Sequence, residues 1–411
     1  MGLGNESIGI EKMNEMEKYV GNGCNINQTI LIYKSWIDID GSIPLNEKKQ
    51  YELGGICMVI SPHTFELRLN VDAQEYQKWT DRAFKNSKGS HKVIVESYGY
   101  EDRAFSEMGV TIEYHNYNES RKNFKRNIRL IVNPSKLLGG DDLNLWKPNN
   151  DNIDKLIKRV KICIENYFDS KYKLKNFTLA RIDFTVNIDV GGREYVSNYI
   201  KILNKLSKVK GYKLKYKKSD EKWYDKDLSF DLAGNSNGVE FTAYDKEAAL
   251  KKKKKEDESR INKAKGVLRI EVRLVKKKSI NKYTNETSAE KQIKDLSKKS
   301  EKIFMENFTR IIPYGDFYKK SEAVSIINSK ISKSVMRKKM LRLLELVPEK
   351  KSLHEAQKAM NDRDMKGIMY EFEKLRLSPV IISKRMKVDR LRCLYDYFVD
   401  WVGGWLSSPK I

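Results

Sequence analysis

Three stretches in the middle of the chain alternate strictly between apolar and polar residues. They are TLARIDFTVNIDV at 178–190, GVEFTAY at 238–244 and VLRIEVRL at 267–274. A period of two places successive side chains on opposite faces of a β-strand, so each stretch predicts a half-buried strand. We expect the apolar positions to face a core and the polar positions to share the other face of one sheet.

The polar positions of these strands carry the residues of chemical interest. They are Arg181, Asp183, Thr185, Asn187 and Asp189 on the first strand, and Tyr244, Arg269, Glu271 and Arg273 on the other two. Polar groups cost free energy when they are buried without partners, so this face needs solvent or a ligand. A tyrosine hydroxyl beside carboxylates and arginines can place a metal ion and a phosphodiester next to a nucleophile.

The same periodicities predict elements along the rest of the chain. Strands are expected at 36–40, 64–71, 91–98, 109–117, 127–133, 212–217 and 228–232. Helices are expected from Asp72, at 152–168 and 196–206, and later at 288–312, 331–347 (stopped by Pro348), from Ser352, and at 367–377 and 388–402. Short connections between neighbouring strands indicate an α+β fold with mostly antiparallel sheets and flanking helices, followed by an all-helical C-terminal region.

Three parts are expected in the chain: a mobile N-terminal arm at 1–29, an α+β domain at 30–278 and a helical domain at 279–411. The helices after 278 are rich in Lys and Arg and are joined by tight turns. They could form a helix-turn-helix unit that binds DNA, or equally a packing or dimerisation unit.

The charge balance narrows the class of partner. The 411 residues include 80 Lys and Arg against 56 Asp and Glu, a net charge of +24. Such an excess favours a polyanion, either nucleic acid or an anionic membrane surface, although a merely lysine-rich soluble protein would share it. Five consecutive lysines, Lys251–Lys255, lie between Tyr244 and Glu271; they form either a solvated segment or a contact to a DNA backbone.

Other patterns exclude several classes of site. The four cysteines are scattered without a CxxC pair, which argues against a zinc ribbon or a disulfide framework and favours a reducing cytoplasm. The sequence has no apolar run near the ~20 residues that span a bilayer and no ATP-binding glycine loop. It has no His-x-His pair, and Glu113 with His115 on one strand face could be metal ligands or simply solvent-exposed.

The three strand motifs carry a resemblance to a known family. RIDFTVNID, YDKEAALKKKKKEDE and LRIEVRL, in this order, resemble the Rep_trans family of rolling-circle plasmid replication initiators and related relaxases, over roughly residues 128–278. The resemblance implies that Tyr244 nicks one DNA strand, and that Asp183 and Glu271 bind a divalent metal, Mg²⁺ or Mn²⁺. Arg273 departs from the pattern, because an acidic residue is expected there.

The resemblance implies a replication initiator that nicks and rejoins origin DNA through a tyrosine–5′-phosphate linkage. Arg181, Arg269 and Arg273 are then expected to bind phosphates, and Lys246, on the same strand face as Tyr244, to lower the pKa of the phenol. The implied partners are double-stranded origin DNA, the single-stranded nick site, a second copy of the chain and a host helicase, with no membrane. A mobilisation relaxase and a non-catalytic DNA-binding regulator remain alternatives. Tyr244 could also be a structural aromatic residue, and Asp183 and Glu271 structural ion-pair partners.

Overall fold

The computed structural model describes residues 58–398, apart from 87–91, 95–98, 103–104, 121–122, 142, 207–208, 210, 216–227 and 253–256. Residues 53–411 form one compact unit, which includes both the predicted α+β part and the predicted helical part. The predicted arm at 1–29, the predicted strand at 36–40 and most of the Lys251–Lys255 run lie outside the described residues.

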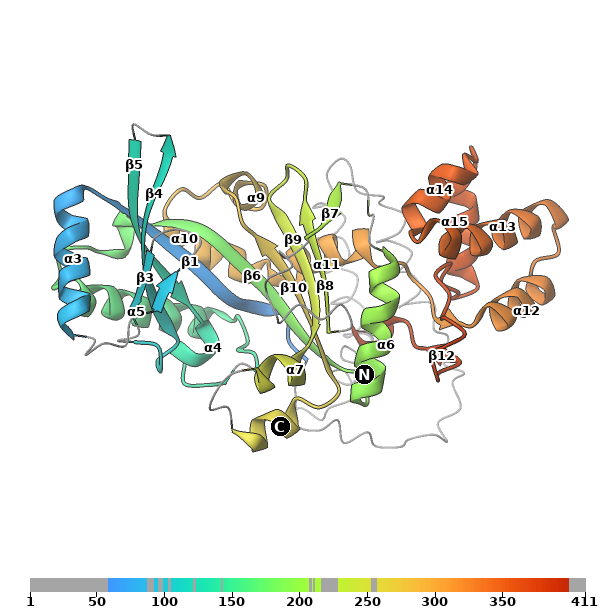
Figure 1. The fold of residues 1–411 in the computed structure, drawn as a ribbon, viewed down its shortest axis with the longest axis horizontal. Coiled ribbons are helices and arrows are strands. Elements are labelled where there is room, and N and C mark those ends of the chain that lie inside the picture. Colours follow the sequence, from blue (N-terminus) through green and yellow to red (C-terminus); the bar gives the residue numbers. More distant parts are fainter. Residues whose placement is uncertain are drawn as a thin grey trace, which may run out of the picture. The chain divides into compact units, whose positions relative to one another are not determined.

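A ten-stranded sheet forms the centre of this unit, and the pairings of its described strands are antiparallel (Figure 1). Its order is β2-β3-β4-β5-β1-β6-β10-β9-β8-β7. The strands are β1 (Ser61–Val71), β2 (Lys92–Ile94), β3 (Gly99–Asp102), β4 (Val110–Ser120), β5 (Asn123–Val132), β6 (Thr178–Asp189), β7 (Tyr212–Leu214), β8 (Ser229–Gly234), β9 (Val239–Asp245) and β10 (Val267–Leu274). The α+β prediction is therefore confirmed, and the three alternating stretches become the adjacent strands β6, β10 and β9.

Helices cover the apolar face of the sheet. Helices α6 (Arg193–Leu203), α10 (Ala289–Lys298) and α11 (Ser300–Ile311) contact the central strands, and α5 (Asn150–Tyr167) packs beside α10. The strands bury alternate residues beneath them, including Ile182, Phe184, Val186, Phe241, Ile270 and Val272, none of which is exposed. The remaining helices of this part are α3 (Ala73–Asn86), α4 (Pro134–Leu137), α7 (Lys246–Lys251), α8 (Glu258–Lys263) and α9 (Lys277–Asn281).

The C-terminal region is helical, with one short sheet added. It contains α12 (Lys320–Lys330), α13 (Ser334–Lys350), α14 (Leu353–Met360) and α15 (Met365–Lys374), and the two-residue strands β11 (Phe317–Tyr318) and β12 (Arg390–Leu391). The predicted start at Ser352 is confirmed, because its hydroxyl accepts a hydrogen bond from the amide of Glu355 at 3.3 Å.

Three predicted helices differ from the structure. The stretch 288–312 is two helices separated at Lys299, which is both the C-cap of α10 and the N-cap of α11. Pro348 lies inside α13 and does not stop it; because the proline is in the last turn, the helix loses only one backbone bond there. The first residues of the helix predicted at 388–402 form a strand, because Arg390 and Leu391 of β12 pair with β11.

A glycine turn fixes the position of β10 beside β6. Gly266 has a φ of +84°, in the left-handed region, and a Cβ there would lie 2.8 Å from the backbone nitrogen of Gly192. Only glycine fits this conformation without strain. The Gly266 carbonyl then accepts a hydrogen bond from the amide of Val190 at 2.9 Å, which sets the register that places Arg273 opposite Asp183.

Candidate active site

The register of three strands brings the predicted site residues into neighbouring rows. Tyr244 on β9 pairs with Arg269 on β10. Two residues along, Glu271 lies between Thr242 and Thr185, and in the next row Arg273 lies opposite Asp183 of β6. The polar face predicted from the alternation therefore exists, and it gathers side chains that are separated by more than eighty positions in the sequence.

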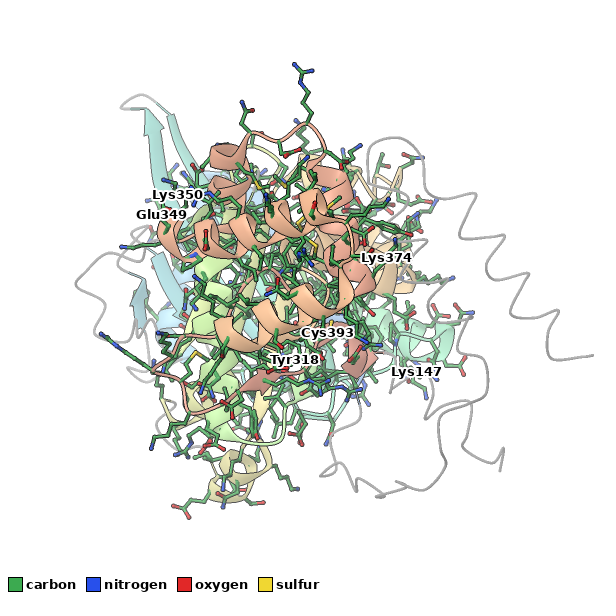
Figure 2. The ribbon with its side chains drawn as sticks, turned by 90° about the vertical axis from the view of Figure 1, so that its right-hand side faces the viewer. Lys147, Tyr318, Glu349, Lys350, Lys374 and Cys393 are labelled. Atoms are coloured by element: carbon green, nitrogen blue, oxygen red, sulfur yellow. The ribbon has the colours of Figure 1, made fainter. Side chains whose placement is uncertain are left out.

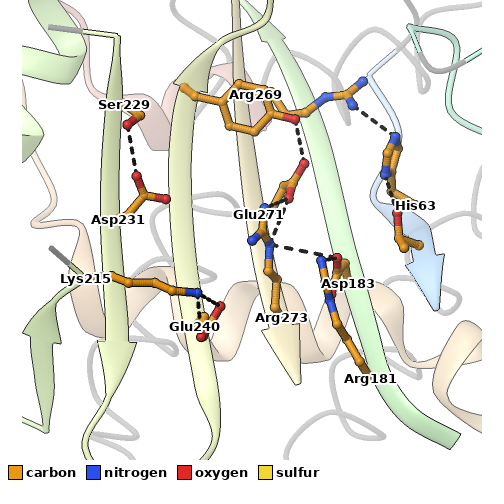
Figure 3. Close-up of polar contacts among 12 residues, drawn as sticks. His63, Arg181, Asp183, Lys215, Ser229, Asp231, Glu240, Arg269, Glu271 and Arg273 are labelled. Atoms are coloured by element: carbon orange, nitrogen blue, oxygen red, sulfur yellow. Dashed lines mark hydrogen bonds and ion pairs between the residues drawn. The ribbon is translucent and has the colours of Figure 1, made fainter. Parts of the chain in front are cut away.

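A chain of hydrogen bonds and ion pairs crosses this face (Figure 3). The Tyr244 hydroxyl donates to Oε1 of Glu271 at 2.7 Å. Arg273 donates to the other oxygen, Oε2, through Nη2 at 2.6 Å and Nε at 3.0 Å. The Arg273 Nε atom also lies 3.8 Å from Oδ2 of Asp183, and Arg181 donates to both oxygens of Asp183, through Nε at 2.7 Å.

A second cationic group lies beside the tyrosine. Arg269 is fully buried, and it donates to Oδ1 of Asn187 at 2.7 Å and approaches Nε2 of His63 at 3.0 Å. His63 was not among the residues predicted from the sequence. It lies where β1 begins, at an irregular register with β6, so the alternation of β1 gave no signal for it.

The segment that follows α4 holds this end of the site together. The indole of Trp146 donates to the carbonyl of Pro62 at 2.6 Å, directly before His63. The side-chain amide of Asn187 donates through Nδ2 to the carbonyl of Leu143 at 2.7 Å. Both contacts fix the ends of β1 and β6 with respect to each other, and they therefore position the partners of Arg269.

The carboxylates lie deeper than the guanidinium groups that bind them. The side chains of Asp183 and Glu271 are 2% and 5% exposed, whereas those of Arg181 and Arg273 are 30% and 23% exposed. A ligand that arrives from solvent therefore meets positive charge first. Arg181 and Arg273 are accessible to a phosphate, while Arg269 is not accessible in this arrangement.

The pKa values follow from this arrangement. Burial raises the pKa of Tyr244 above its usual value, and the negative charge of Glu271 raises it further. Burial also acts to raise the pKa of Glu271, but the positive charges of Arg273 and Arg269 outweigh it and hold that pKa below the usual range. At neutral pH the pair is consequently a protonated phenol hydrogen-bonded to an ionised carboxylate.

The predicted metal ligands do not fit a cation in this arrangement. Both oxygens of Asp183 and both oxygens of Glu271 already accept hydrogen bonds from arginine or tyrosine. Within the described part of the chain, no group of three or more His, Cys, Asp or Glu side chains is placed to share a metal ion. A cation could use these carboxylates only if Arg181 moved away from Asp183 and Arg273 from Glu271.

Lys246 lies elsewhere than predicted, and His115 is buried and not exposed to solvent. Lys246 does not share a strand face with Tyr244, because β9 ends at Asp245 and Lys246 is the first residue of α7, where its side chain is buried. Asp245 ends the strand by capping this helix: its carboxylate accepts the amide of Ala248 at 3.0 Å. On β4, His115 is buried and contacts Glu113 at 2.7 Å, so these two residues pair with each other.

No helix among the described residues combines the length and the apolar character that crossing a bilayer requires.

Comparison with known proteins places the chain in a family. Residues 60–294 match the family model described as "Replication-associated protein G2P N-terminal", and this range includes the whole candidate site. No curated protein matches the chain. Among solved structures, the rolling circle replication initiator protein from Geobacillus stearothermophilus matches with 9% sequence identity and a TM-score of 0.27, covering 80% of this chain and 100% of that one. The family match confirms the resemblance to replication initiators, and the chain belongs to the replication-associated protein family defined by the N-terminal region of G2P.

Proposed function

We propose that this replication initiator nicks and rejoins one strand of origin DNA, with Tyr244 as the nucleophile. The observation that carries the proposal is the hydrogen bond from the Tyr244 hydroxyl to Glu271, within a network that presents Arg181 and Arg273 to solvent. A nucleophile paired with a base, and a base oriented by a third group, is the general arrangement of covalent catalysis.

In the proposed reaction, the Tyr244 oxygen attacks a backbone phosphorus while its proton passes to Glu271. A bond forms between the phenolic oxygen and phosphorus, and the bond from phosphorus to the 3′ oxygen breaks. The 3′ oxygen takes a proton from solvent and becomes a free hydroxyl that can prime synthesis. Because the phosphodiester is exchanged and not hydrolysed, attack by that hydroxyl restores the strand without ATP.

Charge supports the same assignment. The network contains Arg181, Arg269 and Arg273 against the carboxylates of Asp183 and Glu271. This surplus of positive charge suits a phosphodiester, whose transition state gains negative charge on its oxygens. A guanidinium can bind two phosphate oxygens at once, which would hold the phosphorus in line with the tyrosine.

Phosphate binding would also prepare the base. In the free protein, Arg273 lowers the pKa of Glu271, so transfer of the phenolic proton is unfavourable. A phosphate that shares Arg273 weakens its hold on Glu271, raises the pKa of this carboxyl and makes it a better proton acceptor. The site would therefore remain inactive until DNA binds.

The divalent metal remains a prediction of the family resemblance. Because a cation would have to displace Arg181 from Asp183 and Arg273 from Glu271, no step of the proposed reaction passes through a metal. A homodimer, a host helicase and a cytoplasmic location likewise remain predictions. A mobilisation relaxase would use the same chemistry, and the DNA that is nicked would separate it from an initiator.

Tyr244→Phe tests the proposal. We expect this variant to lose nicking of supercoiled DNA that carries the origin of its own replicon, while it still binds that DNA, because only the nucleophilic oxygen is removed. The matched control is Tyr172→Phe, since Tyr172 also donates to a carboxylate, Oε2 of Glu75 at 2.9 Å, outside the site. Mass spectrometry of the covalent protein–DNA adduct should identify Tyr244. Normal nicking by Tyr244→Phe would reject the assignment, and an inactive wild type would favour the non-catalytic regulator.

A further inference from the structure

Helices α12 and α13 are joined by a turn of three residues, Ile331–Lys333. The inner side of the pair is apolar: Ala323 and Ile327 of α12 and Met340 and Leu343 of α13 are not exposed. α13 also packs against α14 and α15, so its inner side is covered along most of its length. Two packed helices joined by a three-residue turn have the connection of a helix-turn-helix, in which the second helix can enter a DNA groove. Figure 2 views the two helices from outside, with Glu349 and Lys350 marking the end of α13.

The outer side of the beginning of α13 is basic and accessible. Lys330, Lys333 and Lys338 are exposed, and within the described residues no hydrogen bond or ion pair engages their side-chain ammonium groups. Among them lies Val335, whose exposed fraction of 67% is unusually high for an apolar residue. By contrast, the basic residues farther along α13 are paired: Arg342 lies 3.6 Å from Glu345, and Lys339 lies 3.0 Å from Asp362.

A second basic segment is attached to the start of α12. Both ends of the loop 383–389 are hydrogen-bonded beside Lys319, the residue that precedes this helix. At one end the amide of Ile382 donates to the carbonyl of Tyr318 at 2.8 Å. At the other end the amide of Lys319 donates to the carbonyl of Asp389 at 3.2 Å. The loop carries three exposed basic residues that no ion pair of the described structure engages, Lys384, Arg385 and Lys387.

We propose that α12 and α13, together with the loop 383–389, form a docking surface for double-stranded DNA, with the beginning of α13 in the major groove. Lysines without acidic partners release counterions when they contact phosphates, and this release drives binding. An exposed apolar side chain at the start of a recognition helix can contact the methyl group of thymine, so Val335 is assigned to base recognition. This inference rests on the proposed function only in taking DNA as the partner, because no candidate catalytic residue belongs to the surface.

The charge test uses the full chain and a fluorescent duplex of about 20 base pairs and arbitrary sequence. The slope of log affinity against log salt is negative for DNA binding. We expect Lys333→Gln/Lys338→Gln to make this slope shallower by about 1.8, which corresponds to two lost phosphate contacts. If the two proteins bind equally at about 1 M salt, the affinity of the variant at about 0.1 M salt should be roughly 60-fold lower than that of the wild type. The matched control is Lys155→Gln/Lys158→Gln, which removes two exposed lysines from α5 and should leave the slope unchanged.

The recognition test uses duplexes selected from a pool with a randomised core. The Val335→Ser variant should select a sequence that differs from the wild-type sequence at one or two adjacent base pairs, with the salt slope preserved. An unchanged slope for the lysine variant, or an equal loss in the α5 control, would overturn the docking surface. An unchanged selected sequence would overturn the role of Val335. If the lysine variant changes its oligomeric state and keeps its affinity for the duplex, the helices bind a second copy of the chain.

Cleavage of a single-stranded oligonucleotide separates this inference from the proposed function. The lysine variant should still cleave it at the wild-type rate, because the strand needs no duplex recognition. Intact cleavage with an unchanged salt slope contradicts only the docking surface. If the wild type does not cleave the oligonucleotide but the lysine variant shows the expected shallower salt slope, only the role of Tyr244 is contradicted.

Discussion

At the scale of residues, the hydrogen bond between Tyr244 and Glu271 combines two groups whose pKa values are shifted in opposite directions. The phenol is held protonated by burial and by the neighbouring negative charge, while Arg273 and Arg269 keep the carboxylate ionised. Neither group titrates near neutral pH. The site is therefore stable as an acid–base pair, and its reactivity depends on what a bound phosphate does to Arg273.

The pH dependence of nicking follows from these directions. Glu271 stays ionised until the pH falls below its lowered pKa, and Tyr244 stays protonated until the pH exceeds its raised pKa. With Glu271 as proton acceptor, single-turnover nicking should be level between about pH 6 and pH 9. A rate that rises about tenfold per pH unit would show that hydroxide, and not Glu271, removes the phenolic proton.

Glu271→Gln separates a proton acceptor from a metal ligand. The amide keeps the shape of the side chain but cannot take the proton, so nicking should fall by about 10²- to 10⁴-fold. Because the lost group is a base, added Mg²⁺ or Mn²⁺ should not restore the rate. Glu75→Gln removes the partner of Tyr172 and serves as the control, with nicking unchanged. Recovery of the rate at high metal concentration would establish the metal prediction and contradict the proton-acceptor role.

At the scale of elements, α7 determines where the strand that carries Tyr244 ends. The helix is tied to α6 by Glu247, which accepts from Nε of Arg193 at 2.9 Å and lies 2.8 Å from Nζ of Lys251. The hydrogen bond from Arg193, partly opposed by burial, lowers the pKa of Glu247 to about 2. The contact therefore joins the helix after β9 to the helix that covers the apolar side of the sheet.

Glu247→Gln should destabilise the chain in a pH-dependent way. A carboxyl whose pKa is lowered on folding stabilises the folded state above its unfolded pKa, and this contribution disappears as the pH falls through the folded value. Near neutral pH we expect a loss of about 1 kcal/mol, kept small because Arg193 is largely exposed and solvent screens the pair. Urea unfolding should show the loss shrinking as the pH falls from about 4.5 towards 2. The exposed Glu258 of α8 provides the control substitution, Glu258→Gln, and an equal loss there would contradict the role of the ion pair.

At the scale of the whole molecule, the last described segment returns to the sheet part of the chain. Phe308 of α11 packs against Tyr395 and Phe398, with ring centroids 5.0 and 5.3 Å apart. The hydroxyl of Tyr199 on α6 donates to the carbonyl of Arg392 at 2.8 Å. The segment after α15 is therefore part of the core beneath the site, although the helices α12 to α15 precede it in the sequence.

A chain that ends at Tyr314 should consequently be unstable. It loses several buried side chains that cover α11, and each large apolar side chain contributes ~1.5–3 kcal/mol when buried. We expect its melting temperature to fall by about 10 °C or more, or its melt to lose cooperativity. Calorimetry and circular dichroism measure both. A melt within about 3 °C of the full chain would show that the returning segment contributes little to the core.

The sequence by itself determined the strands of the site and the identity of its polar side chains. Alternation in β6, β9 and β10 is a local property, because a period of two fixes which residues share a face. The same holds for the cap at Ser352 and for the burial of Phe184 and Val272. The tertiary structure decided which polar groups meet, because register between strands depends on turns and packing and not on the pattern within one strand.

Some site residues were predicted at the wrong place or were not predicted at all, because their positions depend on turns, caps and packing between distant segments. His63 lies at an irregularity of β1, and its contact with Arg269 depends on a segment more than eighty residues away. Lys246 leaves the strand face because Asp245 caps a helix, a choice that competes locally with continued alternation. Arg273 lies opposite Asp183 only through the register of β6 and β10, so its position between two buried carboxylates is a property of the folded sheet.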